Sequence, residues 1–179
     1  MSKTVTSACV IIPPKKIWEP IQKIRREHDS KVHRWMPHVN LFYPFAPKGE
    51  YDRIINDFEK CCNEINAFTI YLKQFKFFRH RYQTYTIWLD PESNEQITHL
   101  QRELLKLVPE YNDINQFTDG FRPHLSVGQF TTYKIHDFIA RLQKNWEILA
   151  FSVNQIYFIS RPNTKDSAFR IIEKIKLNQ

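Results

Sequence analysis

The fold is decided by one short stretch, Arg122-Pro123-His124-Leu125-Ser126-Val127-Gly128-Gln129-Phe130. A weaker copy of it occurs in the first half of the chain, Trp35-Met36-Pro37-His38-Val39-Asn40-Leu41-Phe42-Tyr43-Pro44-Phe45. Each copy has a proline, then a histidine, then a small polar residue two positions later. On an extended strand alternate side chains point to opposite faces, so the histidine and the polar residue share one face and the apolar residues share the other. If both strands face one cleft, they bring two imidazoles together beside a hydroxyl and an amide, which suits acid–base chemistry on an anionic group.

The two copies occupy equivalent places in two halves of similar order. Periodicity predicts, in the first half, strands over 5–12, around His38 and over 68–78, with helices over 15–28 and 54–65. In the second half it predicts strands over 82–89, around His124, over 149–159 and over 169–177, helices over 93–108 and 135–146, and an exposed loop over 109–120.

This order predicts a bilobal α+β fold. We expect two mainly antiparallel sheets related by a pseudo-twofold axis, with helices on the outside and both histidine strands at a central cleft. We expect one bilobal domain over residues 1–179, with lobe-forming repeats at approximately 4–79 and 80–179.

Composition and net charge narrow the class of partner that the protein is expected to bind. The 179 residues are 42% hydrophobic and 15% aromatic, as in a globular protein. Only three glycines occur, which excludes the glycine-rich phosphate loops of the Rossmann and Walker types. The net charge of +7 favours an anionic partner, a nucleotide or RNA, although a simple basic surface is the alternative interpretation.

Other features bear on cellular context and metals. Three cysteines form no disulfide framework, and Cys9 lies in an apolar strand where a packed thiol is expected. No apolar signal region or membrane-spanning run occurs, so we expect a cytoplasmic protein, with the nucleus as the alternative location and no membrane partner. We also expect a monomer. His28, His33 and His38 recur every five residues, a spacing that fits neither helix nor strand, so no metal or other cofactor is expected.

The duplicated motif resembles that of the two-histidine (2H) phosphoesterase superfamily, which includes the 2′-5′ RNA ligase-like proteins and cyclic nucleotide phosphodiesterases. That family carries two His-x-(Ser/Thr)-apolar motifs, one in each lobe. His124-Leu125-Ser126-Val127 matches fully, whereas His38-Val39-Asn40-Leu41 has asparagine at the third position. The resemblance implies that His38 and His124 are catalytic and that Asn40 and Ser126 bind the substrate phosphate. It implies hydrolysis of a 2′,3′-cyclic phosphate or a 2′-5′ phosphodiester of a nucleotide or RNA end, without metal.

The residues support this chemistry independently, because two histidines of ordinary pKa near ~6.5 can serve as base and acid at a phosphodiester. The sequence does not decide which histidine is the base and which is the acid; of the two arrangements we favour His124 as the base and His38 as the acid. A non-catalytic RNA- or nucleotide-binding module is the rival interpretation, favoured by Asn40. Aromatic side chains near the strand ends could stack on a base, but core packing is the expectation for all five: Trp35, Tyr43, Phe77, Phe78 and Tyr82.

Overall fold

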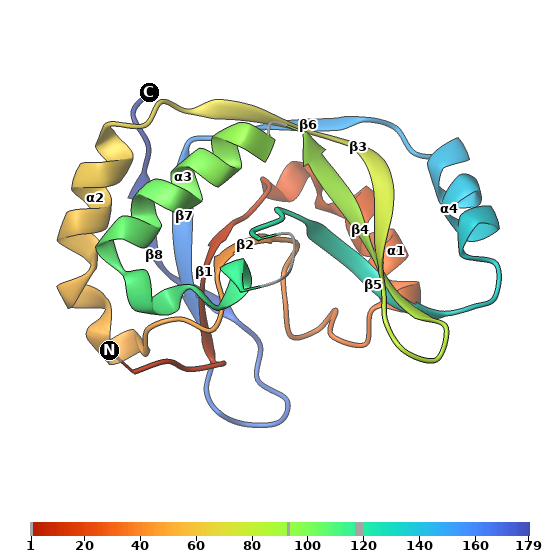
Figure 1. Cartoon of the computed structure of the whole chain (residues 1–179), viewed down its shortest axis with the longest axis horizontal. Helices are drawn as coiled ribbons and strands as arrows, with labels where there is room; N and C mark the ends of the chain where they lie inside the picture. Colours follow the sequence, from red (N-terminus) through yellow and green to blue (C-terminus); the bar gives the residue numbers. More distant parts are fainter. Residues whose placement is uncertain (1, 93, 117–119) are drawn as a thin grey trace.

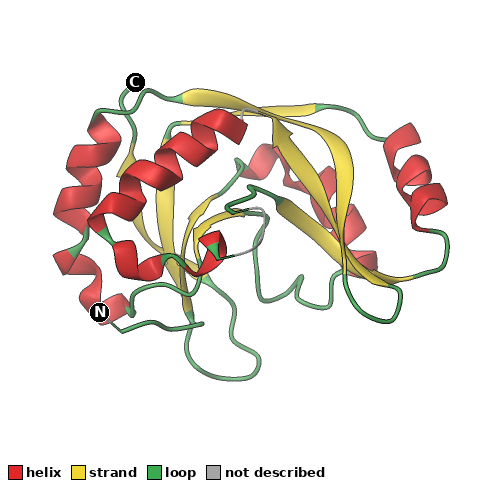
Figure 2. Cartoon of the chain, in the orientation of Figure 1, coloured by secondary structure: helices red, strands yellow, loops and turns green. Residues whose placement is uncertain are grey.

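Two four-stranded antiparallel sheets form the framework of the protein (Figures 1 and 2), seen in a computed structural model that describes residues 2–92, 94–116 and 120–179. The first sheet has the strand order β2 (Val39–Phe42), β1 (Ser7–Ile11), β7 (Gln155–Ser160) and β8 (Arg170–Lys176). The second has the order β5 (Leu125–Thr131), β4 (Thr84–Glu92), β3 (Phe68–Arg79) and β6 (Leu149–Val153). The predicted α+β fold with two antiparallel sheets is therefore confirmed.

In the described ranges, four α-helices lie outside the sheets: α1 (Trp18–His28), α2 (Ile55–Asn63), α3 (Asn94–Leu107) and α4 (Ile135–Lys144). In Figure 1, α2 and α3 lie together beside the first sheet, and α2 contacts β8. On the second sheet, α1 contacts β5 and α4 contacts β3. Short 3-10 helices occupy the remaining helical segments: Lys15–Ile17, Lys48–Arg53, Pro109–Tyr111 and Asp113–Asn115.

The sheets are assembled from both halves of the chain. Strands β7 and β8 from the second half join β1 and β2, whereas β3 from the first half joins β4 and β5. The division into repeats at residues 79 and 80 stays a prediction. The two sheets have similar strand orders. In each sheet the histidine strand lies at an edge and pairs with one antiparallel neighbour. The two edge strands, β2 and β5, contact each other, and this contact brings the two histidine motifs to the centre of the molecule.

Several predicted boundaries are wrong. The single strand over 149–159 is two strands separated by Asn154, and the two belong to different sheets. The strand predicted over 82–89 begins at Thr84 and continues to Glu92, and a bulge in β3 accommodates Pro91 opposite Leu72. The predicted loop contains two short 3-10 helices, while its residues 117–119, and Ser93 at the start of the predicted helix, lie outside the described residues.

The histidine strands alternate as predicted. Val39 and Leu41 are fully buried on β2, and Leu125 and Val127 are fully buried on β5. Gly128 then lets the end of α1 approach β5 closely: a Cβ there would lie 2.7 Å from the carbonyl oxygen of His28. Helix α1 therefore packs against the covered face of β5, and the opposite face is left for the site.

Candidate active site

Both motif histidines are held in the same way. His38 and His124 immediately precede β2 and β5, and Nδ1 of each ring lies beside the backbone carbonyl two residues earlier. The distances are 2.7 Å from His38 to Met36 and 2.8 Å from His124 to Arg122. A carbonyl oxygen only accepts hydrogen bonds, so Nδ1 carries the proton in the neutral ring and Nε2 keeps the free lone pair. In the sequence, one proline separates each histidine from the residue whose carbonyl it contacts.

Aromatic side chains pack against both histidine rings. Trp35 stacks on His38, with ring centroids 4.6 Å apart and an interplanar angle of 14°. Phe78 meets His124 edge to face at 5.1 Å and 87°, and Trp88 approaches the same ring at 5.9 Å. These contacts restrict both imidazoles to one orientation.

A buried ion pair supports the first histidine. Arg25, 2% exposed near the end of α1, donates from Nε to Asp29 at 2.9 Å and from Nη2 to the carbonyl of Trp35 at 2.9 Å. The other oxygen of Asp29 accepts from the backbone of Lys31 at 2.8 Å. Arg25 therefore fixes the turn that carries Trp35, and Trp35 in turn fixes His38. The sequence interpretation missed this residue, since its only signal is an Arg–Asp pair four residues apart, a spacing typical of exposed helix surfaces.

Burial weakens the basicity of both histidines. The pKa of His38 is lowered to about 4, mainly by burial; the charges of Arg25 and His124 act in the same direction, while the Met36 carbonyl and the charge of Asp29 oppose the shift. Burial also lowers the pKa of His124, and the charge of Arg122 adds to this effect. Both rings are therefore neutral at pH 7.

Three of the four predicted site residues line one pocket. Asn40, His124 and Ser126 share a cavity of about 630 Å³, a size typical of small-ligand sites. His38 is absent from the described lining, although its strand contacts β5 and its pKa responds to His124. The Oδ1 atom of Asn40 is buried without a hydrogen-bond partner among the described residues. Such an acceptor is costly unless a donor from a ligand meets it, or unless the amide rotates and presents its NH₂ group.

The other residues considered in the sequence analysis lie in different surroundings. His28 packs against Phe130 at 4.5 Å on the helix-covered side of β5. Within the described chain, no three His, Cys, Asp or Glu side chains converge as metal ligands. The prediction of core packing is wrong for Tyr82, whose side chain is 89% exposed. Phe78 lines the pocket that also contains Asn40, His124 and Ser126, here called the cleft pocket. Cys9 is fully buried, as predicted, and burial raises the pKa of its thiol.

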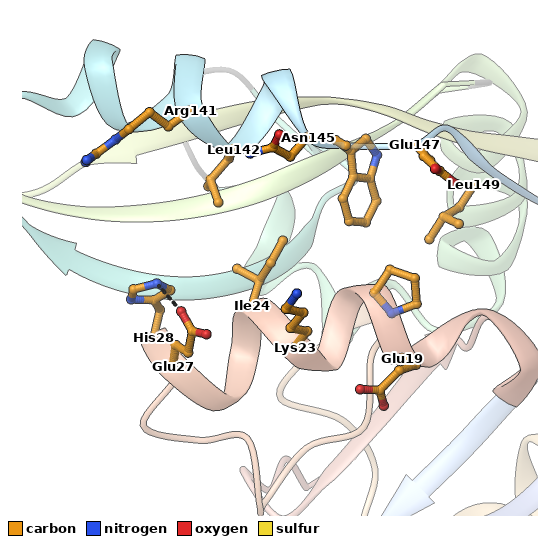
Figure 3. A pocket seen from close by; sticks show the side chains of 12 residues that line it. Glu19, Lys23, Ile24, Glu27, His28, Arg141, Leu142, Asn145, Glu147 and Leu149 are labelled. Carbon is orange, nitrogen blue, oxygen red and sulfur yellow. Dashed lines mark ion pairs between the residues drawn. The ribbon is translucent and has the colours of Figure 1, made fainter.

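A second pocket, of about 500 Å³, lies between α1 and α4 (Figure 3). Its walls carry charges of both signs, including Glu19, Lys23 and Arg141, around apolar side chains such as Ile24 and Leu142. It contains none of the predicted site residues. In the described chain, no helix combines the length and apolar character needed to span a bilayer.

Comparisons with known proteins identify the family of the chain. The family model of the 2′-5′ RNA ligase superfamily matches residues 13–165. A protein of Bacillus cytotoxicus, named as a proposed phosphoesterase, is 26% identical over 137 residues, which cover 75% of this chain and 76% of the relative.

Two solved structures share the fold. Escherichia coli LigT complexed with 3′-AMP has a TM-score of 0.61 at 13% identity, covering 99% of this chain and 100% of that one. TT0787 of Thermus thermophilus has a TM-score of 0.66 at 13% identity, with 98% of both chains covered. The resemblance inferred from the two histidine motifs is confirmed, and the chain belongs to the 2′-5′ RNA ligase superfamily, among the two-histidine phosphoesterases.

Proposed function

We propose that the protein is a metal-independent phosphoesterase that hydrolyses a 2′,3′-cyclic phosphate or a 2′-5′ phosphodiester of a nucleotide or RNA end. The observation that carries this proposal is the matched pair of Nδ1–carbonyl hydrogen bonds at His38 and His124. The two bonds leave an Nε2 atom on each ring for proton transfer. If both Nε2 atoms reach one phosphate, they provide the base and the acid that phosphodiester hydrolysis needs.

His38 acts as the general base and His124 as the general acid. With a pKa of about 4, His38 is neutral over the whole physiological range and can accept a proton; in the reactive form that we propose, the pair carries one proton, on His124. This assignment reverses the one expected from the sequence. The neutral Nε2 of His38 takes a proton from water as the water oxygen attacks phosphorus. The bond from phosphorus to a ribose oxygen breaks, and that oxygen receives the proton of His124, which leaves a phosphomonoester and a free hydroxyl.

Ser126 and Asn40 orient the phosphate. Both line the pocket, where a serine hydroxyl and an asparagine NH₂ can donate to the non-bridging oxygens as negative charge builds in the transition state. The positive net charge of the chain favours binding of an anionic substrate. LigT, which shares the fold, has been solved with 3′-AMP and with ATP, and this supports a nucleotide as the substrate class.

A non-catalytic nucleotide- or RNA-binding module is the second candidate. The asparagine at the third position of the first motif and the positive net charge of the chain favour it, because the charge supports binding of an anion while the motif departs from the Ser or Thr of the catalytic family.

The test is incubation of the protein, with EDTA present, with 2′,3′-cyclic nucleotides and with 2′-5′ and 3′-5′ dinucleotides, followed by mass analysis of the products. Turnover should fall at least about 100-fold in His38→Ala and in His124→Ala. His33→Ala, which changes an exposed histidine outside the cleft, serves as the matched control. Undiminished hydrolysis by the double variant would refute two-histidine catalysis, whereas nucleotide binding without any product would support the binding module.

A further inference from the structure

The cleft pocket takes its described walls almost entirely from one side of the molecule. Asn40 is the only lining residue from the first sheet in the described ranges. Apart from Ile114 of the 3-10 helix Asp113–Asn115, the other described walls come from β3, β4, β5 and the segments that flank β3 and β5. A substrate whose phosphate lies between Asn40 and Ser126 therefore has the rest of its volume against the second sheet.

The strand register identifies the residues that the part of the substrate beyond its phosphate would contact. Ser126 pairs with Trp88, and in the next row across the sheet Phe78, Thr86 and Gln129 pair in turn from β3 to β5. A β-bulge between the two rows turns Gln129 onto the same face as Ser126, despite the odd spacing between them. Two residues along β4 separate the rows, which is about 7 Å. This matches the distance from the phosphate of a nucleotide, across its ribose, to its base.

The Phe78–Thr86–Gln129 row has the chemistry of a base-binding surface. The Gln129 side chain is exposed to the pocket, and its amide offers a donor and an acceptor to the edge of a base. Thr86 Oγ1 lies 2.9 Å from Nε2 of His80, so its hydroxyl is held in place. Phe78 stacks on Trp88 at 4.9 Å and provides a fixed apolar wall.

We infer that the Phe78–Thr86–Gln129 row is a nucleobase subsite, and that Gln129 reads the edge of the base attached to the reacting phosphate. This inference rests on the proposed function. It narrows the substrate class to nucleoside 2′,3′-cyclic phosphates and nucleotide ends that carry a base, in preference to ribose phosphates that lack one.

The test compares kcat/KM for the four nucleoside 2′,3′-cyclic phosphates with kcat/KM for base-free ribose 2′,3′-cyclic phosphate. In the unmodified protein at least one nucleotide should exceed the base-free compound. In Gln129→Ala the ratio between that nucleotide and the base-free compound should fall about three- to tenfold, the effect of one lost hydrogen bond. Gln96→Ala, an exposed glutamine on α3, is the matched control and should keep the original ratio.

An unchanged ratio in Gln129→Ala, with hydrolysis intact, overturns the subsite and leaves the proposed function standing. If no compound is hydrolysed, calorimetric titration with 3′-AMP, 3′-GMP, 3′-CMP, 3′-UMP and inorganic phosphate separates the two ideas. Weaker binding of a nucleotide by Gln129→Ala, with phosphate binding unaffected, supports the subsite even though the proposed function has failed. Nucleotide binding no stronger than phosphate binding overturns it.

Discussion

Removing the imidazole of His38 should change how stability depends on pH. The folded ring has a pKa of about 4, and an unfolded histidine has one near ~6.5. As pH falls through ~6.5 the unfolded chain takes up a proton that the folded ring does not accept until about pH 4. In this window the unfolded state binds more protons, so the free energy of unfolding decreases as pH decreases. The loss is absent above about pH 7 and complete below about pH 4.

Linkage gives the size of this effect. Between about pH 7.5 and pH 5, a shift from ~6.5 to about 4 removes about 2 kcal/mol of stability from the unmodified protein. His38→Gln should lack this loss, because it has no group that titrates there. Urea unfolding followed by circular dichroism at both pH values measures the difference between the two proteins.

His33→Gln is the matched control, since it removes an exposed histidine, and it should keep the pH dependence of the unmodified protein. The reasoning is refuted if His38→Gln and the unmodified protein lose stability equally over this range. An NMR titration that finds His38 protonated with a midpoint near pH 6.5 would likewise remove the basis for its role as the base.

Four further outcomes follow from the structure. Gly128→Ala should cost about 1–3 kcal/mol in chemical unfolding, because its Cβ would lie 2.7 Å from the His28 carbonyl, whereas Gly49→Ala, with nothing within 4 Å, should stay within about 0.5 kcal/mol. Arg25→Met should lower the free energy of unfolding by about 3–5 kcal/mol, because it leaves the buried carboxylate of Asp29 without its charged partner, and a loss below about 1 kcal/mol would contradict the buried ion pair. The pH profile of kcat/KM should be bell-shaped with its maximum between about pH 4 and 6.5, because burial lowers the pKa of both motif histidines; an optimum near pH 8 would argue against this pair. Asn40→Thr should raise kcat/KM about two- to tenfold on a cyclic nucleotide by replacing an unpaired acceptor with a hydroxyl, and a decrease would show that the amide itself is required.

Much of the fold could be predicted because strand and helix periodicity is local. Val39 and Leu41 face inward while Asn40 faces the pocket, and this alternation depends only on an extended backbone. The run over 149–159 shows the limit: its alternation reads as one strand, yet Asn154 divides it between two sheets. Which sheet a strand joins depends on partners far away in the sequence, and no local pattern encodes them.

The candidate site also depends partly on local sequence and partly on long-range contacts. The sequence by itself determined which side chains can do the chemistry and that each histidine precedes a strand with a polar neighbour on one face, because these relations span only a few residues. Tertiary structure alone decided that β2 and β5 meet as sheet edges. It also decided that Arg25 and Trp35 support His38 and that the pocket opens along the second sheet. It set the proposed roles of the histidines as well, since their pKa values depend on burial by atoms from distant segments, and that burial exists only once the chain has folded.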